Sequence, residues 1–77
     1  MEKNAMKSFL DSVDVSTRGK RRKAVILVIE LLKKIRHAEE QYMERIPLHL
    51  RSGAAYSAAE YSADSILDGL YSLVDAY

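Results

Sequence analysis

The chain has 77 residues, of which 48% are hydrophobic and 30% charged, and its formal net charge is +1. These values fit one small domain, and the absence of cysteine excludes thiolate catalysis, cysteine zinc sites and disulfide scaffolds. The long apolar run at residues 24–32 contains Glu30 and is far shorter than the roughly 20 residues of a membrane span, so we expect a cytoplasmic protein without membrane contact. Because so short a chain rarely holds a core alone, we also expect a homodimer.

The first predicted element is a short helix over residues 2–13. Its apolar residues recur at positions i, i+3, i+4 and i+7, which places them on one helix face. These residues are Met6, Phe9, Leu10 and Val13. A helix of this length is marginally stable alone, so it would cap a bundle or cover the rest of the chain.

The second predicted element is a long helix over residues 18–45, before which Ser16 or Thr17 is available as an N-cap. Pro47 ends this helix, because the residue before a proline is disfavoured in the helical conformation. Apolar residues alternate three- and four-residue spacings, as in a helix that presents one seam to a neighbour. The predicted seam consists of Val25, Val28, Leu32, Ile35, Tyr42 and Ile46, interrupted by Glu39.

The third predicted element is a helix over residues 52–76 with Ser52 as its N-cap. Its seam is unbroken and again alternates spacings of three and four residues. This seam consists of Tyr56, Ala59, Ala63, Ile66, Leu70, Leu73 and Tyr77. Gly69 costs about 1 kcal/mol of helix propensity, which predicts tight packing at that position.

The connection between the second and third helices is so short that they must be antiparallel neighbours. We therefore predict an all-α fold, a long antiparallel helical hairpin with a short N-terminal helix, forming a three-helix unit or a dimeric four-helix bundle. Folding the chain about its turn brings Lys34 beside Asp64. It also brings Arg22 and Lys23 beside Asp75.

Charge is strongly segregated along the chain. Residues 1–37 carry ten Lys/Arg and four Asp/Glu, whereas residues 38–77 carry two Lys/Arg and seven Asp/Glu. A basic run favours binding of a polyanion such as nucleic acid, because clustered cations release counterions from phosphates. This run consists of Arg18, Lys20, Arg21, Arg22 and Lys23. The alternative is pairing of these cations with Asp68 and Asp75 across the hairpin.

The third helix offers a candidate partner-binding surface. Tyr61 and Tyr71 lie outside its predicted seam, and exposed tyrosines are frequent anchors of protein interfaces. Asp64 and Asp68 fall between them and would attract a basic partner. We therefore expect these four residues to bind a protein, and a variant of this idea is mimicry of phosphates toward a basic groove.

The sequence offers little for catalysis, because it has no phosphate loop and no nucleophile motif. His37 and Glu40 lie one helical turn apart, and the hairpin would bring Glu60 near them. Carboxylate-bridged metal bundles need Glu-x-x-His from two helices, whereas this chain has the reverse order once. We therefore predict no enzymatic activity, no catalytic residue, no metal and no cofactor.

Several motifs occur in a fixed order along residues 20–77. They are Arg21-Arg22-Lys23, Ala38-Glu39-Glu40-Gln41, Ile46-Pro47 with Leu50 and Ser52, and finally Tyr56, Glu60 and Ile66-Leu67-Asp68. In this order they resemble a group of small helical-hairpin proteins of Gram-positive phages and prophages. The chain departs from the group at Gly53-Ala54, where acidic residues are usual. The resemblance implies a mobile-element origin and brings no catalytic residue with it.

The sequence as a whole favours a non-enzymatic protein interaction module. A phage or mobile-element origin makes inhibition of a host or defence-system protein a concrete form of this function. The alternative is a small nucleic-acid-binding regulator that uses the basic run at residues 18–23.

Overall fold

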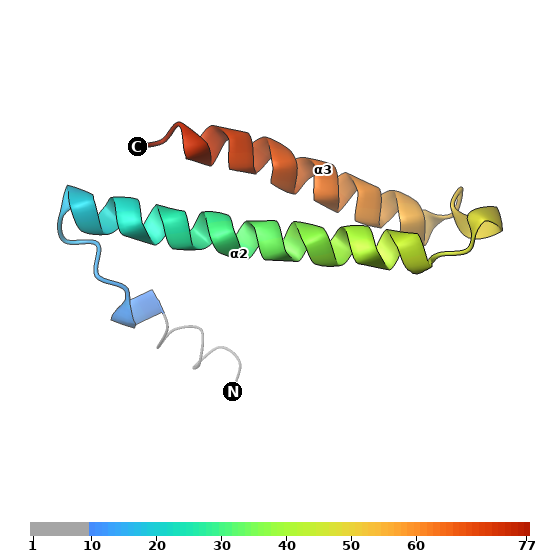
Figure 1. Cartoon of the computed structure of the whole chain (residues 1–77), viewed down its shortest axis with the longest axis horizontal. Helices are drawn as coiled ribbons and strands as arrows, with labels where there is room; N and C mark the ends of the chain where they lie inside the picture. Colours follow the sequence, from blue (N-terminus) through green and yellow to red (C-terminus); the bar gives the residue numbers. More distant parts are fainter. Residues whose placement is uncertain (1–9) are drawn as a thin grey trace.

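The computed structural model describes residues 10–77, and their regular elements are all helical (Figure 1). Two long helices, α2 (Arg18–Arg45) and α3 (Ala54–Val74), pack side by side and are joined by the short 3-10 helix η1 (Leu48–Leu50). The fold is therefore an all-α helical hairpin, as predicted. The C-terminus lies at the same end of the hairpin as the start of α2 (Figure 1).

The ends of α2 follow from local chemistry. Thr17 has an extended backbone, and its Oγ1 accepts a hydrogen bond from the backbone N–H of Lys20 at 3.2 Å, which makes it the N-cap. At the other end Ile46, the residue before Pro47, is extended with ψ 124°. Both ends of α2 agree with the predicted range.

Arg51 fastens the turn between the helices. Its Nε donates a hydrogen bond to the carbonyl of Ile46 at 3.0 Å, and one Nη donates to the carbonyl of Glu44 at 3.5 Å. A cation is favourable here, because the last carbonyls of a helix carry partial negative charge. The guanidinium also lies 5.8 Å from the centre of the Tyr56 ring, so one side chain ties the end of α2 to the first turn of α3.

The prediction of Ser52 as the N-cap of the third helix is wrong. Gly53 is the N-cap and α3 begins at Ala54. The backbone N–H of Gly53 donates to the carbonyl of Leu50 at 3.0 Å, and a Cβ at position 53 would lie 3.1 Å from that oxygen. The turn therefore continues through Ser52, and a residue without a side chain suits its last position.

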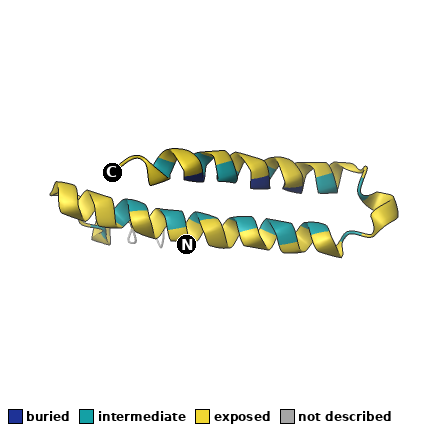
Figure 2. Cartoon of the chain, turned by 45° about the horizontal axis from the view of Figure 1, so that its top comes forward, coloured by how far each residue is buried: buried dark blue, intermediate teal, exposed yellow. Residues whose placement is uncertain are grey.

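The core of the hairpin lies along the predicted seam of α3. Ala59, Ala63 and Leu70 are only 4%, 3% and 8% exposed. The half-buried positions of the same seam are Tyr56, Ile66 and Leu73. The buried residues form a row on the side of α3 that faces α2 (Figure 2). Tyr77 is the exception, because it lies beyond the end of α3 and is 43% exposed.

The predicted seam of α2 is wrong at three of its positions. Val28, Ile35 and Tyr42 are exposed, and their neighbours one residue further along the chain face α3 instead. The half-buried seam consists of Val25, Ile29, Leu32, Arg36, Glu39, Met43 and Ile46. The predicted and observed seams share Val25, Leu32, Glu39 and Ile46.

The predicted ion pairs across the hairpin do not form. Among residues 10–77 there are three ion pairs, Lys20 with Asp14, Lys33 with Glu30 and Arg36 with Glu40, and none joins α2 to α3. The basic residues and aspartates that were expected to pair are exposed and lie away from the line of contact. They are Arg22, Lys23, Lys34, Asp64, Asp68 and Asp75.

The expected tight packing at Gly69 is also absent among residues 10–77, because a Cβ there would meet nothing within 4 Å. Most of the predicted first helix, residues 2–13, lies outside the described residues. Of its described part, residues 10–12 are helical.

Candidate protein-binding surface

The four residues predicted to bind a protein form one surface, the α3 outer stripe, consisting of Tyr61, Asp64, Asp68 and Tyr71. Their spacing of three, four and three residues keeps them on one face of α3. The same helical period that buries Ala59 turns this face outward, and Tyr61 and Tyr71 are 75% and 68% exposed.

The α3 outer stripe lies on a helix that has acidic residues and no basic ones. Residues 52–77 contain no Lys or Arg, and within residues 10–77 the carboxylates of Asp64 and Asp68 form no ion pair. Two exposed aromatic rings beside two unpaired carboxylates suit a partner surface with apolar pockets and basic side chains.

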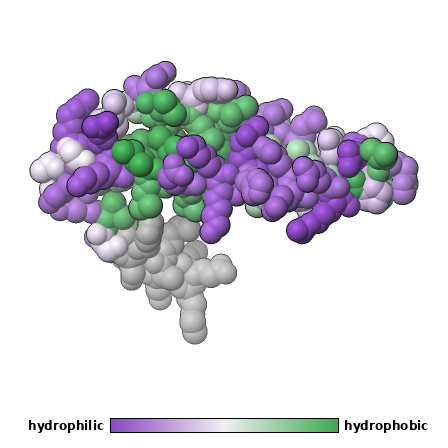
Figure 3. Space-filling view, in the orientation of Figure 1, coloured by the Kyte–Doolittle hydropathy of each residue, from purple (hydrophilic) through white to green (hydrophobic). Residues whose placement is uncertain are grey.

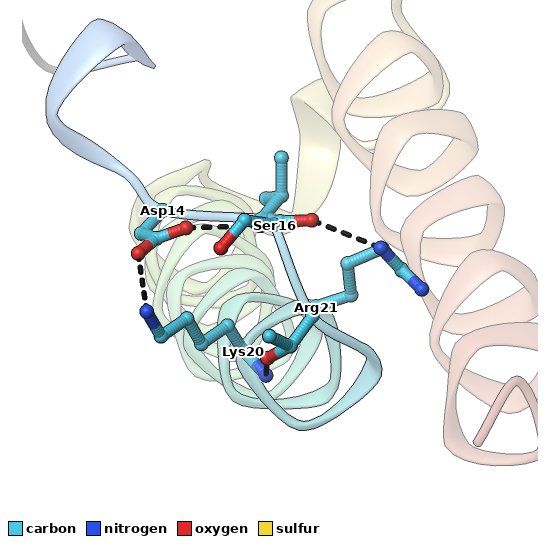
Figure 4. Close-up of polar contacts among 6 residues, drawn as sticks. Asp14, Ser16, Lys20 and Arg21 are labelled. Carbon is cyan, nitrogen blue, oxygen red and sulfur yellow. Dashed lines mark hydrogen bonds and ion pairs between the residues drawn. The ribbon is translucent and has the colours of Figure 1, made fainter.

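The basic run at residues 18–23 is partly engaged in contacts within the chain (Figure 4). Lys20 Nζ lies 2.6 Å from Asp14 Oδ2, and the backbone N–H of Ser16 donates to Asp14 Oδ1 at 2.9 Å. Arg21 donates from Nη1 to the carbonyl of Val15 at 3.0 Å. These contacts fold the connector back onto the first turn of α2.

Asp14 is the centre of this arrangement. Its hydrogen bond with the Lys20 ammonium, reinforced by those with Ser16, lowers the pKa of the Asp14 carboxyl from 3.8 to about 2. Arg18 is engaged separately, because its guanidinium lies 4.8 Å from the centre of the Tyr77 ring. Of the five cations, only Arg22 and Lys23 make no hydrogen bond, ion pair or ring contact within residues 10–77.

His37, Glu40 and Glu60, the residues considered for a metal site, do not form one. Among residues 10–77 there is no group of three His, Cys, Asp or Glu side chains placed to hold a metal ion. Glu40 instead lies 3.0 Å from Arg36 Nη1, whereas Glu39 is half-buried on the seam. No helix within these residues is long and apolar enough to cross a membrane.

Three residues that the sequence assigned to the seam, Val28, Ile35 and Tyr42, belong instead to a second surface. This surface, the α2 apolar stripe, consists of Ala24, Val28, Leu31, Ile35, Ala38 and Tyr42. The four large residues of this stripe are between 41% and 53% exposed. Its signal was present in the sequence, because these positions form a second repeat of four- and three-residue spacings beside the seam. Figure 3, in the orientation of Figure 1, shows apolar side chains gathered over the half of the hairpin that contains the start of α2 and the end of α3.

No protein family, curated protein or solved structure matches this chain. The similarity to phage hairpin proteins is therefore a prediction from the sequence motifs alone, and a functional proposal rests on the geometry described above.

Proposed function

We propose that this protein is a non-enzymatic interaction module that binds another protein through the α3 outer stripe. The observation that carries the proposal is the placement of Tyr61 and Tyr71 on one exposed face, with two carboxylates between them that form no ion pair within residues 10–77. Aromatic side chains dominate the energetics of many interfaces, and acidic residues around them accelerate association with a basic partner.

In its concrete form, the module is encoded by a phage or mobile element, acts in the cytoplasm as a homodimer, and inhibits a host or defence-system protein. The similarity to phage hairpin proteins supports the origin. The excess of exposed apolar residues on α2 supports self-association. The acidic character of α3 supports a basic partner surface such as a nucleic-acid-binding groove, which an inhibitor would occupy.

Affinity capture tests the proposal. The tagged chain is incubated with a lysate of a Gram-positive bacterium, in parallel with a variant carrying Tyr61→Ser and Tyr71→Ser. Serine and tyrosine have similar helix propensities, so α3 should persist in this variant. Leu48→Ser is the matched control, because it removes an equally exposed apolar side chain from the turn.

We expect one partner in stoichiometric amount with the wild type and with Leu48→Ser. The double variant should bind that partner at least roughly thirtyfold more weakly, the loss expected for a residue pair worth about 2 kcal/mol. Recovery of no partner, or of a partner that the double variant retains fully, would refute the assignment. Salt-sensitive binding of duplex DNA that disappears in Arg22→Glu with Lys23→Glu would instead favour the nucleic-acid alternative.

A further inference from the structure

The chain exposes much more surface than a compact domain of its size. Its accessible surface is 6433 Å², whereas a compact monomer of 8.7 kDa exposes about 4700 Å². Its radius of gyration is 16.0 Å, against about 11 Å for a compact chain of this length. Domains normally bury a core between two layers of elements, and this hairpin forms only one.

The α2 apolar stripe marks one broad face of this layer. At the open end of the hairpin, Val28 of the stripe and Leu73 of α3 line the same groove of about 490 Å³. At the turn end, Tyr42 of the stripe and Ala55 of α3 line another groove of about 590 Å³. The stripe and α3 therefore line the same side of the hairpin at both of its ends, and at the open end Leu10, Val13 and Val15 of the same chain also border the stripe.

On that face α3 contributes small residues where α2 contributes large ones. Starting from Ala55, positions at alternating spacings of three and four residues share one side of the helix. These positions are Ala55, Ala58, Ser62, Ser65, Gly69, Ser72 and Ala76. A Cβ at Gly69 would meet only open space within the chain, so its own hairpin gives no packing reason for a glycine there.

The net charges of the whole helices favour one pairing, although the α3 residues of this face are themselves uncharged. The sequence of α2 has nine Lys/Arg and four Asp/Glu, a net charge of +5, whereas α3 has three Asp/Glu and no Lys/Arg, a net charge of −3. Packing α2 against the α3 of a second copy brings opposite charges together, whereas α2 against α2 or α3 against α3 opposes like charges. The same arrangement sets large side chains against small ones.

We infer that the α2 apolar stripe is the docking site for a second copy of this chain, whose α3 packs on it to form an antiparallel four-helix bundle. The excess surface of about 1700 Å² is sufficient, because a standard interface removes about 800 Å² from each partner. The inference deepens the self-association included in the proposed function. It leaves the α3 outer stripe exposed on the bundle.

Gly69→Leu is the decisive variant. Within one chain the new side chain points into open space and improves helix propensity, so the hairpin should fold. In the bundle it would separate the two copies. Gly19→Leu is the matched control, because a Cβ at Gly19 also meets nothing within 4 Å and this position lies outside the docking face. Light scattering after size exclusion gives the mass, and circular dichroism verifies that both variants are helical.

We expect a dimer for the wild type and for Gly19→Leu. Gly69→Leu should raise the dissociation constant by roughly tenfold to a hundredfold, the cost of forcing a side chain into a packed interface. A monomeric wild type, including one whose own N-terminal segment covers the stripe, would overturn the inference, as would a helical Gly69→Leu that dimerises as tightly as the wild type. Tyr61 and Tyr71 lie outside this face, so the capture experiment can fail or succeed independently.

Discussion

At the residue scale, Asp14 shows how a connector acquires a defined conformation. The carboxylate accepts from the Lys20 ammonium and from the backbone N–H of Ser16, so it holds together residues on both sides of the N-cap Thr17. This contact also removes Lys20 from the pool of cations that a polyanion would attract. Part of the basic run therefore stabilises the start of α2 and its connector.

The depressed pKa of Asp14 gives a pH-dependent contribution to the stability of this connector. The carboxyl has a pKa of about 2 in the folded chain and 3.8 in the unfolded chain, so the contribution is complete above about pH 4 and is lost as the pH falls toward 2. NMR titration of the Asp14 carboxyl carbon should show the low pKa. Lys20→Met should return it toward 3.8, since the Lys20 contact is the largest cause. An unchanged pKa in that variant would contradict this assignment, and Lys33→Met serves as the control.

At the element scale, the line of contact between α2 and α3 contains an unusual polar insertion. Arg36 occupies a seam position, its Nη1 lies 3.0 Å from Glu40, and its Nε is buried without a hydrogen-bond partner among the described residues. An unsatisfied buried donor costs about 1–3 kcal/mol, whereas a half-exposed ion pair returns less than that. Arg36 therefore makes a net unfavourable contribution to the packing of α2 on α3.

Arg36→Met should stabilise the hairpin by roughly 1 kcal/mol, because it removes the unsatisfied N–H and keeps a long flexible side chain on the seam. Glu40 is sufficiently exposed to be hydrated without its partner. Urea unfolding measures the change. Lys33→Met is the control, because it breaks the exposed pair with Glu30 and should shift stability by less than about 0.5 kcal/mol. Destabilisation by Arg36→Met would mean that the ion pair supports the fold.

Helix positions and the facing side of α3 could be predicted from the sequence, whereas the facing side of α2 could not. Thr17 and Pro47 determine the ends of α2 by local backbone chemistry. On α3 a single apolar repeat that includes Ala59 and Ala63 identifies the buried side. On α2 the repeat with Val28 and Ile35 and the repeat with Ile29 and Arg36 both contain Val25 and Leu32. Periodicity alone therefore does not show which repeat faces α3. The exposure of Tyr61 and Tyr71 followed from the α3 period. The contacts of Asp14 could not be predicted, because the connector is irregular and has no repeating pattern.

At the scale of the whole molecule, the thin shape and the exposed stripe mean that stability should depend on protein concentration. The chain measures 51 Å along its longest axis and only 15 Å along its shortest, and few of its residues are shielded from water. If folding is completed by a second copy, the folded state is favoured by mass action.

The midpoint of thermal unfolding should therefore rise with concentration. A tenfold increase adds about 1.4 kcal/mol of stabilisation to a dimer, which corresponds to roughly 3–6 °C for a folded unit of about 150 residues. Differential scanning calorimetry over a hundredfold range of concentration measures this rise. Gly69→Leu should unfold at a lower temperature and with a weaker dependence at the lowest concentrations, where it is monomeric. A midpoint that is independent of concentration in the wild type would show that a single chain is the cooperative unit, with its core completed by its own residues.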